Sequence, residues 1–165
     1  MTEEVKIVCC STRILAHKNA LTSSEKDWKE ILIRLEHKLP TVSEYTYLRD
    51  SVGWLKIDEQ AAEIALSNSL FSVVALENNE IVGLGRIVGD GGIYYYIQDL
   101  IVHPRLQRQS IGKKLMDELM TYINANAKTG AFVGLMAAKG LERYYESFGF
   151  KARNQDAPGM YQVIE

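Results

Sequence analysis

The chain has few of the residues that would tie it to a disulfide scaffold or to a metal site. Only two cysteines occur in 165 residues, and because Cys9 and Cys10 are adjacent a disulfide between them would close a strained ring. His17, His37 and His103 are scattered along the sequence, without the spacing of a zinc site. We therefore expect a reduced, cytoplasmic protein without disulfides or metal.

Long apolar runs and an excess of charge of one sign are missing as well. The formal net charge is -2, which argues against nucleic acid or an anionic membrane as the main partner. No apolar run reaches the roughly 18 residues of a membrane span, and the chain opens on Thr2-Glu3-Glu4 instead of a signal peptide's basic and apolar segments. The length suits a single domain over residues 1–165.

The most informative segment runs from Gln98 to Met116, where an apolar strand leads through a polar turn into a helix. A helix N-terminus presents unpaired N–H groups and a partial positive charge, so residues 107–112 could hold a pyrophosphate largely by main chain. Gly112 would allow a phosphate to approach the backbone closely, and Arg108 and Lys113 add positive charge. The alternative interpretation is an ordinary strand-to-helix connection with a solvated basic rim.

Two common nucleotide-binding motifs do not fit this segment. Gly112-Lys113 superficially resembles a P-loop, but the upstream glycine and the Ser or Thr after the lysine are missing. No dinucleotide-type GxGxxG follows the first plausible strand either. The phosphate hypothesis therefore depends on a different kind of turn.

Periodicity predicts the elements of the first half. A short strand is expected over residues 5–10, and a helix capped by Ser23 or Ser24 ends near Pro40. The apolar stripe of that helix consists of Trp28, Ile31, Leu32 and Leu35. Residues 41–48 alternate and predict a strand, and Asp58 begins a helix that ends near Asn68.

Three strands of an antiparallel meander are predicted next, over residues 71–76, 81–88 and 93–102. Gly83 and Gly85 lie on one face of the second strand, where missing side chains leave room for a ligand or for close packing. Both uses stay open at this point.

The second half reads as a strand, a helix and a strand. A helix is predicted over residues 111–127, and a continuous apolar strand, buried on both faces, over residues 131–138. Together with residues 93–102 this demands a right-handed parallel crossover. A short helix over residues 140–149 and a final strand from Phe150 to near Tyr161 complete the pattern.

This order of elements, with the turn Gln107–Gly112 after a strand and Tyr144–Phe150 near the end, resembles the GNAT superfamily of acyl-CoA-dependent N-acetyltransferases over about residues 41–163. The resemblance implies a mixed α/β fold in which an antiparallel meander leads into a β-α-β unit with splayed central strands. Residues 1–40 would then be an N-terminal extension that covers the acceptor site, forms a homodimer contact or packs on the body.

The resemblance also implies acetyl-CoA as donor, with its pyrophosphate on the amides of the turn. The family pattern is Gln or Arg, two variable residues, Gly, a variable residue, and Gly or Ala. The cofactor-binding residues carried over from it are Gln107, Arg108, Gln109, Ser110, Ile111, Gly112 and Lys113. Ser110 stands where the family usually has glycine, so either its backbone is already compatible or the loop has shifted.

The pantetheine arm and the reaction centre follow from the same resemblance. The strand through Leu100, Ile101 and Val102 would bind the pantetheine by backbone groups and supply an oxyanion donor. Ala138 stands where many relatives carry an asparagine near the cofactor, so that contact is absent or replaced, for example by Lys139.

Tyr145 falls where relatives often place a general acid, which would protonate the departing CoA thiolate. A phenol with a pKa near 10 is protonated at neutral pH and can donate that proton. The alternative is that Tyr145 only packs against the cofactor or hydrogen-bonds to it. His103, directly before Pro104, is interpreted as a loop residue.

The base that accepts the amine proton has three candidates. They are Glu44 on the first pocket-facing strand, Asp99 at a strand end, and a water relayed past Tyr94 and Tyr96. Glu44 could equally be a solvated surface acid, and Asp99 could merely fix the turn. Tyr94-Tyr95-Tyr96 could likewise line an acceptor pocket or pack in the sheet.

We therefore expect an N-acetyltransferase that moves an acetyl group from acetyl-CoA to a primary amine of a small molecule or peptide by direct attack. No metal, nucleic acid or membrane is expected to take part. The alternative function is a catalytically weak acyl-CoA-binding regulatory or interaction module that keeps the turn but lacks turnover.

Overall fold

The computed structural model describes residues 32–163, so the expectations for residues 1–31 lie outside the described chain. The elements in chain order are β1 (Ile33–Glu36), α1 (Val42–Ser51), α2 (Glu59–Ser67), β2 (Phe71–Glu77), β3 (Glu80–Gly89), β4 (Tyr94–Val102), a 3-10 turn η1 (Pro104–Leu106), α3 (Ile111–Asn126), β5 (Phe132–Gly134) and α4 (Glu142–Glu146). The mixed α/β expectation is confirmed.

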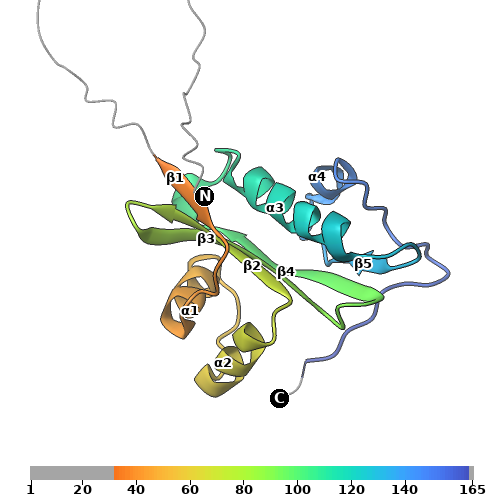
Figure 1. The fold of residues 1–165 in the computed structure, drawn as a ribbon, viewed down its shortest axis with the longest axis horizontal. Coiled ribbons are helices and arrows are strands. Elements are labelled where there is room, and N and C mark those ends of the chain that lie inside the picture. The colour runs from red at the N-terminus through yellow and green to blue at the C-terminus, as the bar shows by residue number, and fades with distance from the viewer. Residues whose placement is uncertain (1–31, 164–165) are drawn as a thin grey trace, which may run out of the picture.

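The five strands form one sheet in the order β1-β2-β3-β4-β5. The pairs from β1 to β4 are antiparallel, and β5 joins β4 in parallel. Figure 1 shows α1 and α2 on one face of this sheet and α3 on the other. Helix α4 lies on the α3 side, where Tyr144 approaches Gly112 at the start of α3. Each face therefore buries its own apolar cluster against the sheet.

The hairpin between β2 and β3 forms as its sequence predicts. Its two-residue turn is Asn78-Asn79, and both residues have positive φ, at 50° and 67°. Left-handed central residues are what a type I′ turn requires, and asparagine tolerates them better than most side chains. The predicted antiparallel hairpin is confirmed.

The two glycines of β3 serve close packing. A Cβ atom on Gly83 would lie 3.0 Å from Leu115 Cδ1, and one on Gly85 would lie 2.9 Å from Leu119 Cδ1. Both leucines belong to the fully buried stripe of α3. The missing side chains thus let α3 approach the sheet, and they do not open space for a ligand there.

The helix expected to run from Ser23 toward Pro40 is wrong where it can be checked, because residues 33–36 form strand β1. Ile33 is buried at 2% exposure and Leu35 packs against the same cluster, so the side chains alternate as in a strand. Leu32 and Leu35 also fit a helical spacing of three, which produced the error. Trp28 and Ile31 lie outside the described residues.

The strand expected over residues 41–48 is also wrong, because these residues start helix α1. Thr41 caps it: its Oγ1 accepts from the Glu44 amide at 3.2 Å, and the Glu44 carboxylate accepts from the Thr41 amide at 2.7 Å. Tyr45 and Leu48, three residues apart, are its buried side chains. The Thr-x-x-Glu pattern of a capping box was present in the sequence and outweighs the alternation.

The C-terminal part differs from expectation in two ways. Strand β5 is only three residues long and its Phe132 is 48% exposed, so this strand is not buried on both faces. Residues 150–163 form no strand. The parallel pairing of β5 with β4, joined through α3, is as predicted.

Candidate functional site

Strand β4 carries a bulge in its second half. Leu84 pairs with Ile101 and Arg86 with Gln98, so the single residue Gly85 faces both Asp99 and Leu100. Asp99 has a φ of 53°, which is left-handed and rare for a residue inside a strand. The extra residue reverses which face the following side chains occupy: Ile97 packs in the α3-side cluster and Ile101 in the cluster under α1 and α2.

Beyond the bulge, β4 turns main-chain groups toward an open edge. The ladder with β5 ends at Tyr96 and Gly134. The His103 amide donates to the Val82 carbonyl at 2.8 Å. Main-chain groups alternate in an antiparallel ladder, so those of Ile101 point toward β3 and those of Leu100 and Val102 point away from β3. The assignment of Leu100, Ile101 and Val102 to a pantetheine arm stays a prediction.

The polar turn after β4 ends in a left-handed residue at the start of α3. Arg108 and Ser110 have φ values of 63° and 61°. Ser110 is the N-cap residue of α3, but its side chain makes no capping hydrogen bond. Gln107 donates from Nε2 to the Val102 carbonyl at 3.0 Å and so ties the turn to the end of β4. A turn of this kind gathers backbone N–H groups into a concave anion site at the positive end of a 16-residue helix.

The left-handed Ser110 explains why glycine is usual at this position in the resembling family. Glycine adopts that backbone conformation without steric cost, whereas serine can adopt it only against a clash of its Cβ atom. Ser110 adopts this left-handed conformation here, which is the one that glycine would take at least cost.

A buried hydroxyl lies beside the same helix start. The Oη of Tyr144 is 3.7 Å from the position a Cβ atom on Gly112 would take, and Val102 Cγ2 is equally close to it. This hydroxyl is buried and has no hydrogen-bond partner among the described residues. Burial and the neighbouring Tyr145 and Asp117 raise the pKa of Tyr144 well above its usual range, so it stays a donor. The sequence analysis did not single out this hydroxyl.

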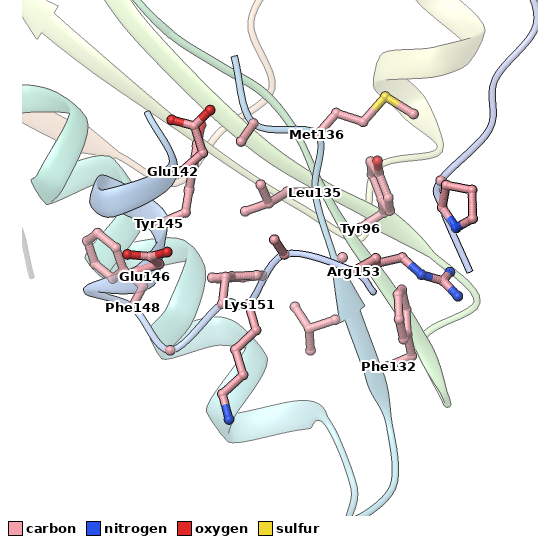
Figure 2. A pocket seen from close by; sticks show the side chains of 18 of the residues that line it. Tyr96, Phe132, Leu135, Met136, Glu142, Tyr145, Glu146, Phe148, Lys151 and Arg153 are labelled. Atoms are coloured by element: carbon pink, nitrogen blue, oxygen red, sulfur yellow. The ribbon is translucent and has the colours of Figure 1, made fainter. Parts of the chain in front are cut away.

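A cavity of about 800 Å³ opens around β5 and α4. In Figure 2 the side chains of Glu142, Tyr145 and Phe148 line one side of β5, and those of Tyr96 and Phe132 line the other. The volume falls within the usual range of small-molecule sites. The cavity therefore adjoins the side of the sheet where β4 and β5 separate.

Tyr145 stands at this cavity with its ring in the core. It is 8% exposed, and its ring meets those of Tyr144 and Phe150 edge-on, with centroids 5.0 Å and 6.4 Å away. Burial raises the pKa of Tyr145 above that of a free phenol. The group is thus a neutral proton donor at physiological pH.

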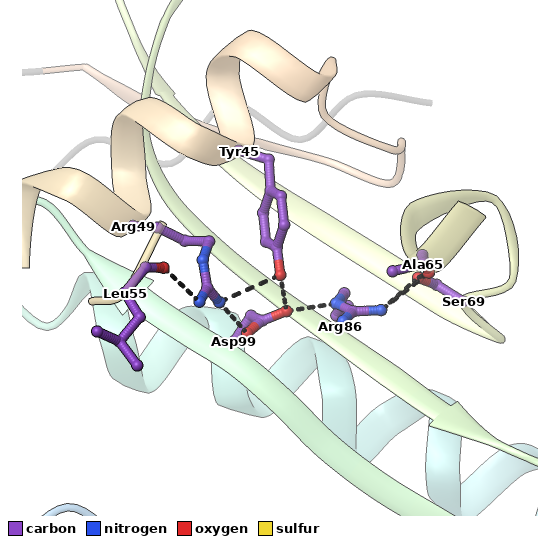
Figure 3. Close-up of polar contacts among 7 residues, drawn as sticks. All are labelled: Tyr45, Arg49, Leu55, Ala65, Ser69, Arg86 and Asp99. Atoms are coloured by element: carbon purple, nitrogen blue, oxygen red, sulfur yellow. Dashed lines mark hydrogen bonds and ion pairs between the residues drawn. The ribbon is translucent and has the colours of Figure 1, made fainter. Parts of the chain in front are cut away.

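Asp99 lies at the centre of a buried polar network on the other face of the sheet (Figure 3). Its Oδ2 accepts from Tyr45 Oη at 2.7 Å and from Arg86 Nε at 2.5 Å, and its Oδ1 faces Arg49 Nη1 at 3.5 Å. Arg86 also donates to the Ala65 carbonyl and to Ser69 Oγ, and Arg49 to the Leu55 carbonyl. Burial, followed by the charge of Asp99, raises the pKa of Tyr45.

The remaining candidates from the sequence lie in three different parts of the fold. The Glu44 carboxylate belongs to the α1 cap and is not on a pocket-facing strand. His103 Nδ1 accepts from the Arg105 amide, and its ring stacks on Tyr47 at 5.6 Å. Of the three consecutive tyrosines, Tyr95 is buried in the core and Tyr96 lines the cavity.

Sequence reasoning missed the partners of Asp99, namely Tyr45, Arg49 and Arg86. One signal was available: Arg86 sits within an apolar strand, and a buried arginine requires an acceptor. Which carboxylate would meet it depends on how α1, β3 and β4 pack together.

Two further properties concern the described residues as a whole. Residues 32–163 hold no cluster of three or more His, Cys, Asp or Glu side chains suited to a metal ion. No helix in this part of the chain combines the length and the apolar character that crossing a membrane requires.

Comparison with known proteins gives a consistent result. The sequence matches the acetyltransferase (GNAT) domain family over residues 48–158. It is 27% identical over 164 residues to an uncharacterized N-acetyltransferase ycf52 of Pyropia yezoensis, covering 88% of this chain and 92% of that protein.

Solved structures agree with the sequence match. A probable acetyltransferase from meticillin-resistant Staphylococcus aureus is 32% identical with a TM-score of 0.76, covering 80% of this chain and 99% of the other. A GNAT family acetyltransferase from Streptococcus pneumoniae is 33% identical with a TM-score of 0.68, covering 80% and 98%. The resemblance inferred from the turn and the late aromatic motif is confirmed: this chain belongs to the GNAT superfamily of acetyltransferases and is an acyltransferase.

Proposed function

We propose that the protein transfers an acetyl group from acetyl-CoA to a primary amine of a small molecule or peptide. The observation that carries this proposal is the juxtaposition of an amide-rich turn at the start of α3 with a β4 strand that separates from β5 after Tyr96. This arrangement supports the proposal, because a donor with a pyrophosphate and an extended arm requires an anion site and an open strand edge end to end.

The pyrophosphate is assigned to the turn from Gln107 to Lys113. The left-handed Arg108 and Ser110 orient its amides, and the absence of a side-chain cap on α3 leaves the amides of its first turn available to an anion. Lys113 is exposed and pairs with Asp117 at 2.8 Å, so it contributes charge at the rim. The residues present therefore fit a diphosphate.

The pantetheine arm is assigned to the edge of β4. Leu100 and Val102 would bond it through main-chain groups, like an added strand. The Tyr144 hydroxyl, which has no partner within residues 32–163, would reach its phosphate end near Gly112. The thioester would then lie toward the bulge, with the acetyl group between the separated strands.

The acetyl-transfer step needs an oxyanion donor, an acid for the thiolate and an acceptor for the amine proton. The neutral amine nitrogen attacks the thioester carbonyl carbon, a β4 amide stabilises the oxyanion, and the carbon–sulfur bond breaks as Tyr145 protonates the departing thiolate. The carboxylates of Glu44 and Asp99 are both engaged in structural contacts. For the proton of the amine we therefore favour a water relayed past Tyr96, which lines the cavity.

Calorimetric titration with acetyl-CoA tests the donor assignment. Gly112→Asp places a negative charge where the Cβ atom has room, 3.7 Å from its nearest neighbours, so we expect it to abolish binding without unfolding the protein. Gly92→Asp is the matched control, because it adds the same charge at an exposed turn with similar room. Equal binding by both variants would contradict the assignment.

Tyr145→Phe then tests the acid. With an amine acceptor found by screening, we expect kcat to fall about 100-fold or more while acetyl-CoA affinity stays unchanged. An unchanged kcat would leave Tyr145 as a packing residue. Donor binding without turnover of any amine would instead support the non-enzymatic acyl-CoA-binding module.

A further inference from the structure

The bulge of β4 is held by polar contacts from elements far apart in the sequence. Asp99 receives hydrogen bonds from Arg86 on β3 and from Tyr45 on α1. Because Arg86 also bonds the Ala65 carbonyl, the network extends to the end of α2. Figure 3 shows the Asp99 carboxylate between the two arginines, with Tyr45 descending on it from α1.

Stability alone gives little reason for this arrangement. Asp99 adopts a left-handed backbone in mid-strand, and its side chain is 1% exposed. Burying charged groups costs desolvation, and well-packed apolar residues often serve as well or better. Strained and desolvated groups of this kind concentrate where a backbone must be held in an unusual geometry for function.

The position of the bulge relates it to the reaction centre. Asp99 directly precedes Leu100. From the ladder pattern beyond the bulge we infer that the Leu100 amide points away from β3, toward the side where β4 and β5 separate. The same carboxylate faces Arg49, which bonds the Leu55 carbonyl in the connection between α1 and α2 at 3.1 Å. Arg49 thus links the carboxylate of the bulge residue to the α1–α2 connection.

Resting on the proposed acetyl transfer, we propose that Asp99, clamped by Tyr45 and Arg86, is a positioning residue that holds the β4 bulge so that its amides polarise the thioester carbonyl. It does not accept the amine proton itself. Its oxygens are occupied by Tyr45 Oη and by the guanidinium groups of Arg86 and Arg49.

The test compares two buried tyrosines that each lose one hydroxyl. Tyr45→Phe removes the bond to Asp99, whereas Tyr95→Phe removes a bond of 3.0 Å to the Gly91 carbonyl from the same strand β4, on the α3 side. Asp99→Asn keeps the shape and removes the charge. Each variant is taken as the full chain, with thermal unfolding to confirm that it is folded.

The first measurement is isotope-edited infrared spectroscopy of bound acetyl-CoA labelled at the thioester carbonyl. We expect the carbonyl band to shift to lower frequency on binding to the unmodified protein and to Tyr95→Phe. The shift should be reduced in Tyr45→Phe and lost in Asp99→Asn, although all four proteins bind acetyl-CoA within about twofold, because the turn is untouched. This readout needs no acceptor amine.

The second measurement is the split between kcat and KM. We expect kcat to fall about 10-fold in Tyr45→Phe and about 100-fold in Asp99→Asn, as when an oxyanion donor is displaced, with KM for acetyl-CoA unchanged. An unshifted band in the unmodified protein, variants that keep its shift and kcat, or losses no larger than in Tyr95→Phe would each overturn the positioning role. Failure of the unmodified protein to bind acetyl-CoA would instead overturn the proposed function and this inference with it.

Discussion

The two faces of the sheet are built by different means. On the α3 face, glycines at positions 83 and 85 of β3 let an apolar helix stripe approach the strands closely. On the face covered by α1 and α2, an otherwise apolar cluster surrounds the ion pairs of Asp99. Strand β4 serves both, because its bulge moves its apolar side chains from one face to the other. The difference indicates that one face provides close packing and the other fixes a local backbone geometry.

The largest effect is expected from removing the carboxylate at the centre of the polar face. Asp99→Ala leaves Arg86 buried, with a side chain 8% exposed, and without its acidic partner. We expect the free energy of unfolding to fall by about 3–5 kcal/mol in urea denaturation. Arg34→Ala, which breaks an ion pair on a side chain 38% exposed, is the control and should cost about 1 kcal/mol or less. Similar losses of unfolding free energy in both variants would show that the buried network of Asp99 is no more stabilising than a surface ion pair.

The apolar face is disturbed next by adding a single methyl group. In Gly85→Ala the new Cβ atom would lie 2.9 Å from Leu119 Cδ1, so α3 or its leucine must move. We expect a loss of roughly 1–3 kcal/mol of unfolding free energy. Gly112→Ala, whose Cβ atom would have 3.7 Å of room, is the matched variant for the same methyl group and should change stability much less. A Gly85→Ala protein more stable than the unmodified one would show that α3 does not pack closely on β3 at this position.

The sequence predicted the region from β2 to α3 correctly because its signals are strong and agree. The strands there are apolar over most of their length, and the 16 residues of α3 repeat an apolar stripe over several turns. Strand β1 and helix α1, within residues 33–51, were assigned wrongly because short elements carry weak periodicity signals. Leu32, Ile33 and Leu35 fit both periods, and only pairing with β2 decides between them.

The candidate site was predictable only where it is local in sequence. The turn from Gln107 to Gly112 is contiguous, so the family resemblance reached it directly. The network of Asp99 joins residues 45, 86 and 99, and these meet only once α1 and β3 are packed. The left-handed backbone at Ser110 could not be predicted either, because a serine in a sequence does not indicate that conformation as a glycine does.

A smaller effect is expected at the start of α1, at the edge of the polar face. Thr41→Ala removes a cap in which Thr41 and Glu44 bond each other's backbone amides. We expect a loss of about 1 kcal/mol in thermal or urea unfolding. Glu44→Gln should cost less, since an amide oxygen can still accept, and should leave kcat unchanged. A kcat that falls with Glu44→Gln in a fully folded protein would restore Glu44 as a candidate base.

The smallest effect separates two of the left-handed residues of the candidate site, Asp99 and Ser110. Both pay a steric cost for their backbone, but the Ser110 side chain makes no cap bond, whereas the Asp99 side chain holds two hydrogen bonds to buried partners. Ser110→Gly should therefore stabilise the protein by roughly 0.5–1 kcal/mol, since relief of the clash exceeds the entropy that glycine adds to the unfolded chain. Asp99→Gly relieves the same clash and should still destabilise, because the network loses its acceptor. Unfolding curves of the two variants decide the matter: if both changes stabilise, strain and not the side chain determines the geometry of the bulge.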